Sequence, residues 1–176
     1  MKKITLENYY QADEIVKLFN TLIPGTEVTR SLTETDYINY ISDVKLNENV
    51  PEEIHSIFDA AVALYCYGYL YWTFFTLAQE QALKSMEAAV SIVHSNIFGK
   101  NTDGNRAITF SKMISQLIKK GIIHKEKKNQ YFAIRHLRNS SFHPESQSQF
   151  GHSTVNTLRS IANNINDLFT IVLRNR

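Results

Sequence analysis

Cysteine, proline and glycine are scarce in this chain. Its 176 residues include one cysteine, three prolines and six glycines. A single cysteine excludes an intramolecular disulfide, and we expect Cys66, among apolar neighbours, to be a buried hydrophobic residue rather than a catalytic thiol. Few prolines and glycines disfavour a turn-rich β architecture and favour helices. The length suits one domain with a sizeable hydrophobic core.

A secretory signal is also lacking. Lys2 and Lys3 are followed by Glu7 and Asp13, and no apolar segment stands behind them. Because a secretory signal needs such a segment, we expect a cytoplasmic protein.

One stretch without formal charge, residues 60–79, is long enough to cross a bilayer. It contains Tyr65, Tyr67, Tyr69 and Tyr71. Membrane spans carry tyrosines at their two ends, whereas these lie in the middle, so we expect burial or a subunit interface and no membrane contact. Tyrosines combine a large contact area with a polar tip, which suits a homodimer interface. Stacking of these rings on nucleic-acid bases is the weaker alternative.

Charge is unevenly distributed along the chain. Residues 1–99 contain 6 Lys/Arg against 13 Asp/Glu, whereas residues 100–176 contain 13 Lys/Arg against 4 Asp/Glu. This asymmetry indicates that the second half meets a polyanion or the acidic half of another subunit. Ordinary solvated surface charge is the alternative.

The spacing of apolar residues predicts an all-α fold. Helices are expected near residues 12–23, 35–44, 52–96, 110–120, 129–142 and 155–171. Pro24 and Gly25 end the first helix, and the third needs a bend near Gly68 because an uninterrupted helix would span ~70 Å. Gly121 is a candidate C-cap, and Asn164 is assigned to the polar face of the last helix.

Residues 135–144 concentrate the groups that phosphodiester chemistry needs. Arg135 and Arg138 lie one helical turn apart and can present planar guanidinium groups to phosphate oxygens. His143 can gain or lose a proton near neutral pH. Pro144 disfavours helix at His143, so the chain can turn and bring the imidazole back toward Arg138. The alternative is structural, with Arg138 capping the helix and His143 in a turn.

The order Arg138-Asn139-x-x-x-His143 resembles the signature of HEPN (higher eukaryote and prokaryote nucleotide-binding) domains, which is Arg, a polar residue, three variable positions and His. Upstream, residues 80–84 resemble a Glu-x-Ala-Leu-Lys element on an earlier helix of these domains. The segment 110–123 precedes the motif with the order and spacing of many members. The resemblance covers about residues 55–174.

The resemblance implies an up-and-down HEPN-like bundle of four to five helices over residues 51–176, preceded by an N-terminal helical extension over residues 1–50. HEPN domains are commonly homodimers in which the motifs of two protomers face one cleft. Catalytic members are metal-independent endoribonucleases. The RNA 2′-hydroxyl attacks the adjacent phosphorus and leaves a 2′,3′-cyclic phosphate and a 5′-hydroxyl.

The resemblance also assigns roles by position. His143 would be the general acid or base, and Arg138 would stabilise charge on the phosphate oxygens. Asn139 would orient or contact the phosphate. The expected secondary contacts are Arg135, His136 and Glu80, the last by orienting Arg138.

Cofactors and metals have little support in the sequence. No tight Cys/His spacing predicts a metal site, and no glycine-rich loop predicts a bound nucleotide cofactor.

RNA is the expected partner. A defence or toxin–antitoxin role, with an antitoxin or regulatory protein as a further partner, is what many prokaryotic relatives imply. The alternative function is a non-catalytic HEPN module that binds a protein partner, a nucleotide or RNA.

Overall fold

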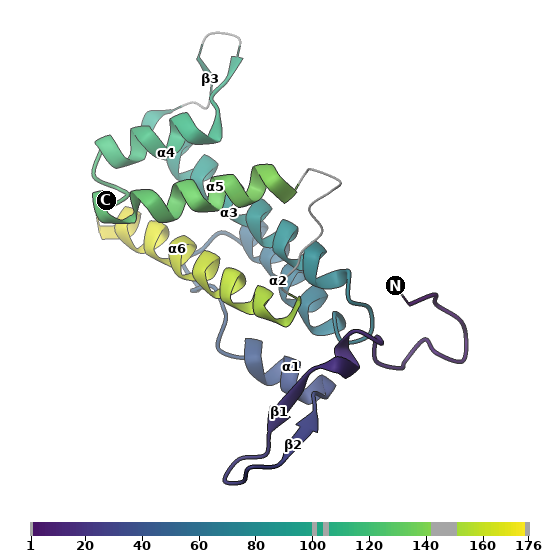
Figure 1. Ribbon diagram of the computed structural model, residues 1–176. Helices are drawn as coiled ribbons and strands as arrows, with labels where there is room; N and C mark the ends of the chain where they lie inside the picture. Colours follow the sequence, from purple (N-terminus) through teal and green to yellow (C-terminus); the bar gives the residue numbers. More distant parts are fainter. Residues whose placement is uncertain (1, 100–101, 104–105, 142–150, 175–176) are drawn as a thin grey trace.

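The computed structural model describes residues 2–99, 102–103, 106–141 and 151–174. In these ranges the α-helices are α1 (Glu34–Ile41), α2 (Glu52–Tyr67), α3 (Phe74–Phe98), α4 (Phe110–Lys119), α5 (Lys128–Ser141) and α6 (Thr154–Arg174) (Figure 1). Two small hairpins pair β1 (Asn20–Leu22) with β2 (Thr29–Ser31) and β3 (Thr102–Asp103) with β4 (Arg106–Ala107). Short 3-10 turns are η1 (Val16–Leu18), η2 (Lys125–Lys127) and η3 (Gly151–Ser153). The predicted all-α class is confirmed.

Helix α3 lies at the centre of the bundle and contacts α2, α4, α5 and α6 (Figure 1). Its 25 residues give it a length of about 37 Å. Its buried apolar side chains are Phe75, Ala78, Ala82, Leu83, Met86, Ala89, Val90 and Val93. A helix that is apolar on several sides must be enclosed by its neighbours, and this explains the central position of α3.

The predicted break at Gly68 is confirmed. Helix α2 ends at Tyr67, and α3 begins at Phe74 after a tight corner. A Cβ atom on Gly68 would lie 2.4 Å from the Phe75 ring, so only glycine lets the ring pack this close to the backbone. The uncharged stretch 60–79 is therefore divided between two helices. None of the helices in the described ranges is long and apolar enough to cross a membrane.

The helix expected over residues 12–23 is wrong. The segment forms the single turn η1 and then the strand β1, which pairs with β2 through Asn20–Ser31 and Leu22–Thr29. Val16 is buried, but the Leu22 side chain is 60% exposed, so the apolar spacing does not correspond to one buried face. Pairing with β2 gives this backbone the hydrogen bonds that a helix would have supplied.

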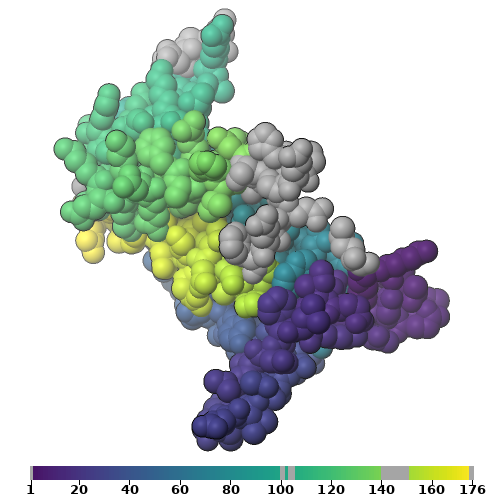
Figure 2. Space-filling model, in the orientation of Figure 1, coloured from purple at the N-terminus to yellow at the C-terminus, as the bar shows by residue number. Residues whose placement is uncertain are grey.

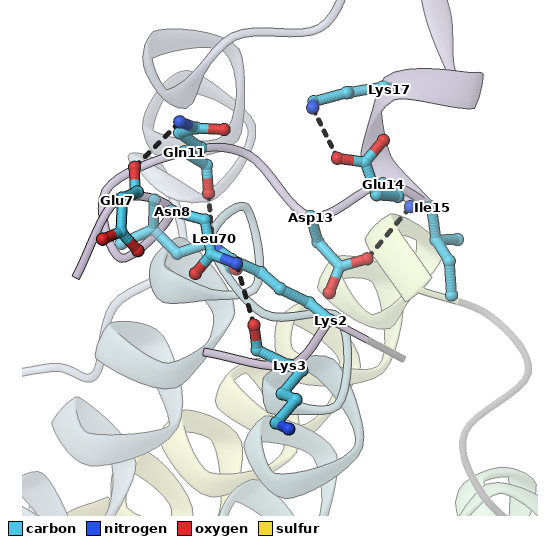
Figure 3. A network of polar contacts seen from close by, with 10 residues as sticks. All are labelled: Lys2, Lys3, Glu7, Asn8, Gln11, Asp13, Glu14, Ile15, Lys17 and Leu70. Atoms are coloured by element: carbon cyan, nitrogen blue, oxygen red, sulfur yellow. Dashed lines mark hydrogen bonds and ion pairs between the residues drawn. The ribbon is translucent and has the colours of Figure 1, made fainter. Parts of the chain in front are cut away.

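Polar contacts hold the N-terminal segment against the corner between α2 and α3 (Figure 3). Lys2 Nζ donates to the carbonyl oxygens of Leu70 at 3.0 Å and of Gln11 at 2.5 Å. The Asp13 carboxylate is buried and accepts hydrogen bonds from the Ile15 and Trp72 amides at 2.9 and 3.0 Å. A buried carboxylate needs such partners, so Asp13 fixes the segment to the bundle.

The segment 1–50 contains one α-helix, which begins after Thr33 as expected. A hairpin and a 3-10 turn replace the rest of the expected helical extension. Its buried residues Val16, Leu32, Tyr37 and Ile41 belong to the same hydrophobic cluster as the bundle core. In the space-filling view the N-terminal residues adjoin the beginning of α6 (Figure 2).

The predicted C-cap at Gly121 is confirmed, whereas the predicted polar position of Asn164 is wrong. Gly121 has a φ of 80° after α4, and its amide and that of Ile122 donate to the carbonyls of Ile118 and Leu117, which completes a Schellman motif. Asn164 is buried rather than on the polar face of α6. Its Nδ2 donates to the Ser160 carbonyl at 2.7 Å, so the buried amide nitrogen has a local partner.

Candidate functional site

The candidate motif lies in the last turns of α5, which ends at Ser141. Tyr131 and Ile134 are buried on the face of α5 that meets the bundle. Arg138 follows Ile134 by four residues and so lies on the same face, directed toward α3. Asn139 is one position further around the helix and is exposed.

Arg138 pairs with Glu87 of α3. Its Nε lies 3.2 Å from Glu87 Oε2, and its Nη2 lies 3.1 Å from Oε1. This two-point arrangement fixes the plane of the guanidinium group as well as its position. The remaining arm, Nη1, donates to Asn139 Oδ1 at 3.4 Å. Both members of the ion pair keep 35% of their side-chain surface exposed, so a ligand can approach them.

Glu87 was missed by the sequence analysis, which assigned the orienting role to Glu80. The two glutamates are seven residues apart on α3, so they share a helix face and differ by about 10 Å along it. Sequence spacing gives the face that points at α5 but not the level at which the two helices meet. The sequence could therefore predict that a glutamate on this face of α3 pairs with Arg138, but it could not distinguish Glu87 from Glu80.

The other predicted contacts are distributed as follows. Arg135 and His136 are exposed on α5. His143 lies outside the described residues, as do Phe142 and Pro144, so the approach of its imidazole to Arg138 stays a prediction. The structural alternative for Arg138 has partial support, because a cation in the last turn of a helix is favourable there and this one also forms an ion pair.

A second polar contact between helices, not foreseen from the sequence, lies on the same face of α3. The buried His94 is seven residues beyond Glu87, and its Nε2 is 2.7 Å from Gln116 Oε1 on α4. Its ring packs on Phe98 with centroids 4.6 Å apart. Because the His94 ring is buried, this contact is a link between α3 and α4 rather than a solvent-facing catalytic histidine.

The tyrosine-rich stretch does not form one surface. Tyr65 is buried and its hydroxyl donates to the His152 carbonyl at 3.0 Å, whereas Tyr67 is 58% exposed. Burial raises the pKa of the Cys66 thiol, which keeps the thiol protonated at neutral pH and disfavours a catalytic cysteine. The predicted homodimer interface could therefore use only the exposed part of this stretch, such as Tyr67, and it stays a prediction.

Within the described residues, no three His, Cys, Asp or Glu side chains converge on a point where they could hold a metal ion. The chemistry that the described part of the site offers is therefore that of a fixed guanidinium and a neighbouring amide. These groups can bind an oxyanion such as a phosphate.

Comparisons with known proteins add no assignment. A scan against protein-family models, a search of curated proteins and a search of solved structures each found no match for this chain.

Proposed function

We propose that this protein is a metal-independent endoribonuclease of the HEPN type, acting on RNA at a cleft between two copies of the chain. The observation that carries the proposal is the Arg138–Glu87 pair, which holds a half-exposed guanidinium beside Asn139 at the end of α5. His143 follows five residues later, directly before Pro144. The proposal therefore rests on an arginine held in position by Glu87, five residues before a histidine in the sequence.

The reaction needs one bond to form and one to break at phosphorus. The RNA 2′-oxygen attacks the adjacent phosphorus as its proton passes to a His143 imidazole. The bond from phosphorus to the 5′-oxygen then breaks, and that oxygen takes a proton from the partner protomer's imidazolium. The products are a 2′,3′-cyclic phosphate and a 5′-hydroxyl, without consumption of water.

The charged groups have separate tasks in this scheme. Negative charge grows on the phosphate oxygens as the fifth bond forms, and the Arg138 guanidinium stabilises it. Glu87 touches neither RNA nor reacting atoms, so it is a positioning residue. Asn139 accepts a hydrogen bond from Nη1 of the guanidinium and contacts the same phosphate.

The direct test is cleavage of a mixed-sequence, single-stranded RNA in EDTA. We expect cleavage by the native protein, cyclic-phosphate ends by mass spectrometry, and rates at least ~100-fold lower for His143→Ala. His55→Ala is the matched control, because the His55 ring lies on α2, where it hydrogen-bonds with the Asn47 carbonyl, and its loss should leave the rate unchanged. Equal cleavage by the native and His143→Ala proteins would remove His143 from the mechanism.

A non-catalytic module is the second candidate, and the distribution of exposed apolar side chains favours it. Of fourteen such large side chains in the described chain, ten lie between Ile4 and Tyr67. Exposed apolar patches mark contacts with other proteins, so an antitoxin or regulatory partner would dock on this N-terminal region. A stable complex together with no cleavage of any RNA tested would favour this candidate.

A further inference from the structure

One end of the bundle carries a dense group of basic side chains. Helix α4 ends, α5 begins and α6 ends side by side at the left of Figure 1, and their atoms adjoin in Figure 2. The cations here are Lys119, Lys120, Lys125, Lys127, Lys128 and Arg174, and we call this group the basic end. The same elements contribute two acidic residues, Glu126 and Asp167.

The basic end surrounds a cavity of about 280 Å³. Lys127, His124 and Arg174 line it, together with Thr170 and the buried Tyr131. Lys127 forms an ion pair with Asp167. Among the described residues this is the one ion pair that a cation of the basic end makes, so most of its positive charge is directed to solvent.

A polar stripe connects the basic end to the candidate site. Lys128, Arg135 and Asn139 are spaced by seven and four residues on α5, so they lie within about 20° of one line along the helix. All three are exposed. The stripe therefore runs from the first residue of α5 to the residue beside Arg138.

We infer that the basic end and the stripe of Lys128 and Arg135 form a track that binds single-stranded RNA away from the phosphate held at Arg138. This inference rests on the proposed function. Lys128 and Arg138 are ten residues apart, or about 15 Å along the helix. A stacked strand advances ~3.4 Å per nucleotide, so the basic end binds phosphates roughly four to five nucleotides from the Arg138 phosphate.

A polyanion fits the basic end better than the acidic half of another subunit does. Some of the acidic charge of residues 1–99 is already paired inside the chain. Asp36 pairs with Arg30, Asp43 with Arg159 and Glu87 with Arg138. The acidic half therefore has less free charge to offer than its composition indicates, whereas an RNA backbone has one charge per nucleotide.

The test measures RNA binding in a background that does not cleave, His143→Ala. The track variant is Lys119→Glu, Lys120→Glu and Lys125→Glu, and the probe is a fluorescein-labelled, unstructured 12-nucleotide RNA followed by anisotropy. The matched control variant is Lys3→Glu, Lys17→Glu and Lys84→Glu, which alters net charge equally at exposed lysines outside the elements that form the basic end. Equal thermal melting of the three proteins checks folding, and the corresponding Gln variants replace any that melts early.

We expect the track variant to bind the 12-nucleotide RNA at least about tenfold more weakly, with a salt-dependence slope smaller by about two, since each lost phosphate contact removes ~0.7. The control variant should stay within about twofold of the background. A 4-nucleotide RNA, measured by competition, should bind the track variant and the background alike, because it cannot span ~15 Å from Arg138 to the basic end.

Each contrary result has a distinct meaning. Equal losses in the track and control variants would overturn the track. So would a track variant that changes the mass of the assembly but not RNA binding, because the basic end would then be a subunit contact. If His143→Ala loses cleavage but the track variant binds the 12-nucleotide RNA as the background does, the nuclease proposal is supported and the track is overturned. If the track variant alone loses binding but the native protein does not cleave RNA, the track is supported and the nuclease proposal is overturned.

Discussion

Partial exposure determines what the pair of Arg138 and Glu87 contributes. Each side chain keeps 35% of its surface exposed, so solvent screens their attraction and its effect on folding is about 1 kcal/mol or less. The geometric effect is larger, because two hydrogen bonds hold the guanidinium plane in one orientation. At the scale of residues, the pair therefore matters more for the proposed function than for stability.

Replacement of Glu87 tests this separation. We expect Glu87→Ala to lower the cleavage rate about tenfold, because a loosely held group loses part of its positioning effect. Glu87→Gln should restore part of the rate, since its amide oxygen still accepts one hydrogen bond. Thermal unfolding of both variants should differ from the native protein by no more than about 1 kcal/mol. A Glu87→Ala protein that cleaves RNA as fast as the native protein would contradict the positioning role.

Asp36 gives a pH-dependent prediction at the same scale. Its carboxylate accepts from both arms of Arg30 at 2.6 and 2.7 Å and from the Thr33 amide at 2.8 Å, at the start of α1. The Arg30 guanidinium and these hydrogen bonds hold the pKa of the Asp36 carboxyl well below its usual range. A lowered pKa in the folded state means that the stabilisation is present above the unfolded value of about 3.9 and is lost in stronger acid.

Asp36→Asn should therefore unfold more easily than the native protein by about 1 kcal/mol at neutral pH, as for the loss of a helix cap. The difference in melting temperature should shrink as the pH falls below about 4, because the Asp36 carboxyl then binds a proton in the unfolded chain while the folded ion pair still resists protonation. Glu48→Gln, at an exposed site, is the control and should show no such trend. A constant difference from pH 7 to pH 2 would contradict the role of the charge.

At the scale of elements, the corner between α2 and α3 organises the molecule. It turns the chain so that the two helices pack along one another, and it receives the N-terminal segment through Asp13. The corner needs a residue without a side chain at Gly68, where the Phe75 ring occupies the place of a Cβ atom. The φ of Gly68 is −55°, so the requirement comes from space and not from backbone conformation.

Gly68→Ala should consequently be destabilising, although alanine favours helix more than glycine does. Overpacking at such a contact costs about 1–3 kcal/mol, measurable by urea unfolding. The double variant Gly68→Ala, Phe75→Leu should lose less unfolding free energy than the sum of the losses of the two single variants. The smaller leucine side chain leaves room for the alanine Cβ. Ser56→Ala, at an exposed position of α2, should stay within about 0.5 kcal/mol. Strict additivity of Gly68→Ala and Phe75→Leu would argue against the steric explanation.

At the scale of the whole molecule, Trp72 joins segments that are distant in the sequence. Its ring stacks on Phe19 with centroids 5.5 Å apart, and its amide donates to Asp13. A Cβ atom on Gly151 would lie 2.0 Å from the Trp72 ring, so the beginning of η3 packs against the same side chain. The N-terminal segment, the α2–α3 corner and the start of the last helical region thus share one contact point.

Trp72 is the only tryptophan of the chain, so its fluorescence reports on this junction. We expect urea unfolding followed by this fluorescence and by far-UV circular dichroism to coincide, as for a single cooperative unit. Asp13→Ala should shift both transitions together by about 1–3 kcal/mol, because the Trp72 amide then lacks its buried partner. A fluorescence transition at lower urea than the dichroism transition would show that residues 1–50 unfold separately.

The sequence by itself determined the helical class and the ends of helices at Gly68 and Gly121. These features depend on local causes, namely the spacing of apolar residues and, at Gly121, the positive φ that glycine adopts without strain. Arg138 and Asn139 were also expected near the end of a helix and lie in the last turns of α5, whereas the placement of His143 stays a prediction.

Only the tertiary structure decided the form of residues 12–31, the burial of Asn164 and the choice of Glu87 over Glu80. In the first case a strand partner seven to eleven residues away supplies the backbone hydrogen bonds, and apolar spacing in a short segment does not reveal it. In the other two, the level at which one helix meets the next selects the residue. That level is set by the packing of whole side-chain surfaces, which the spacing within one helix does not contain.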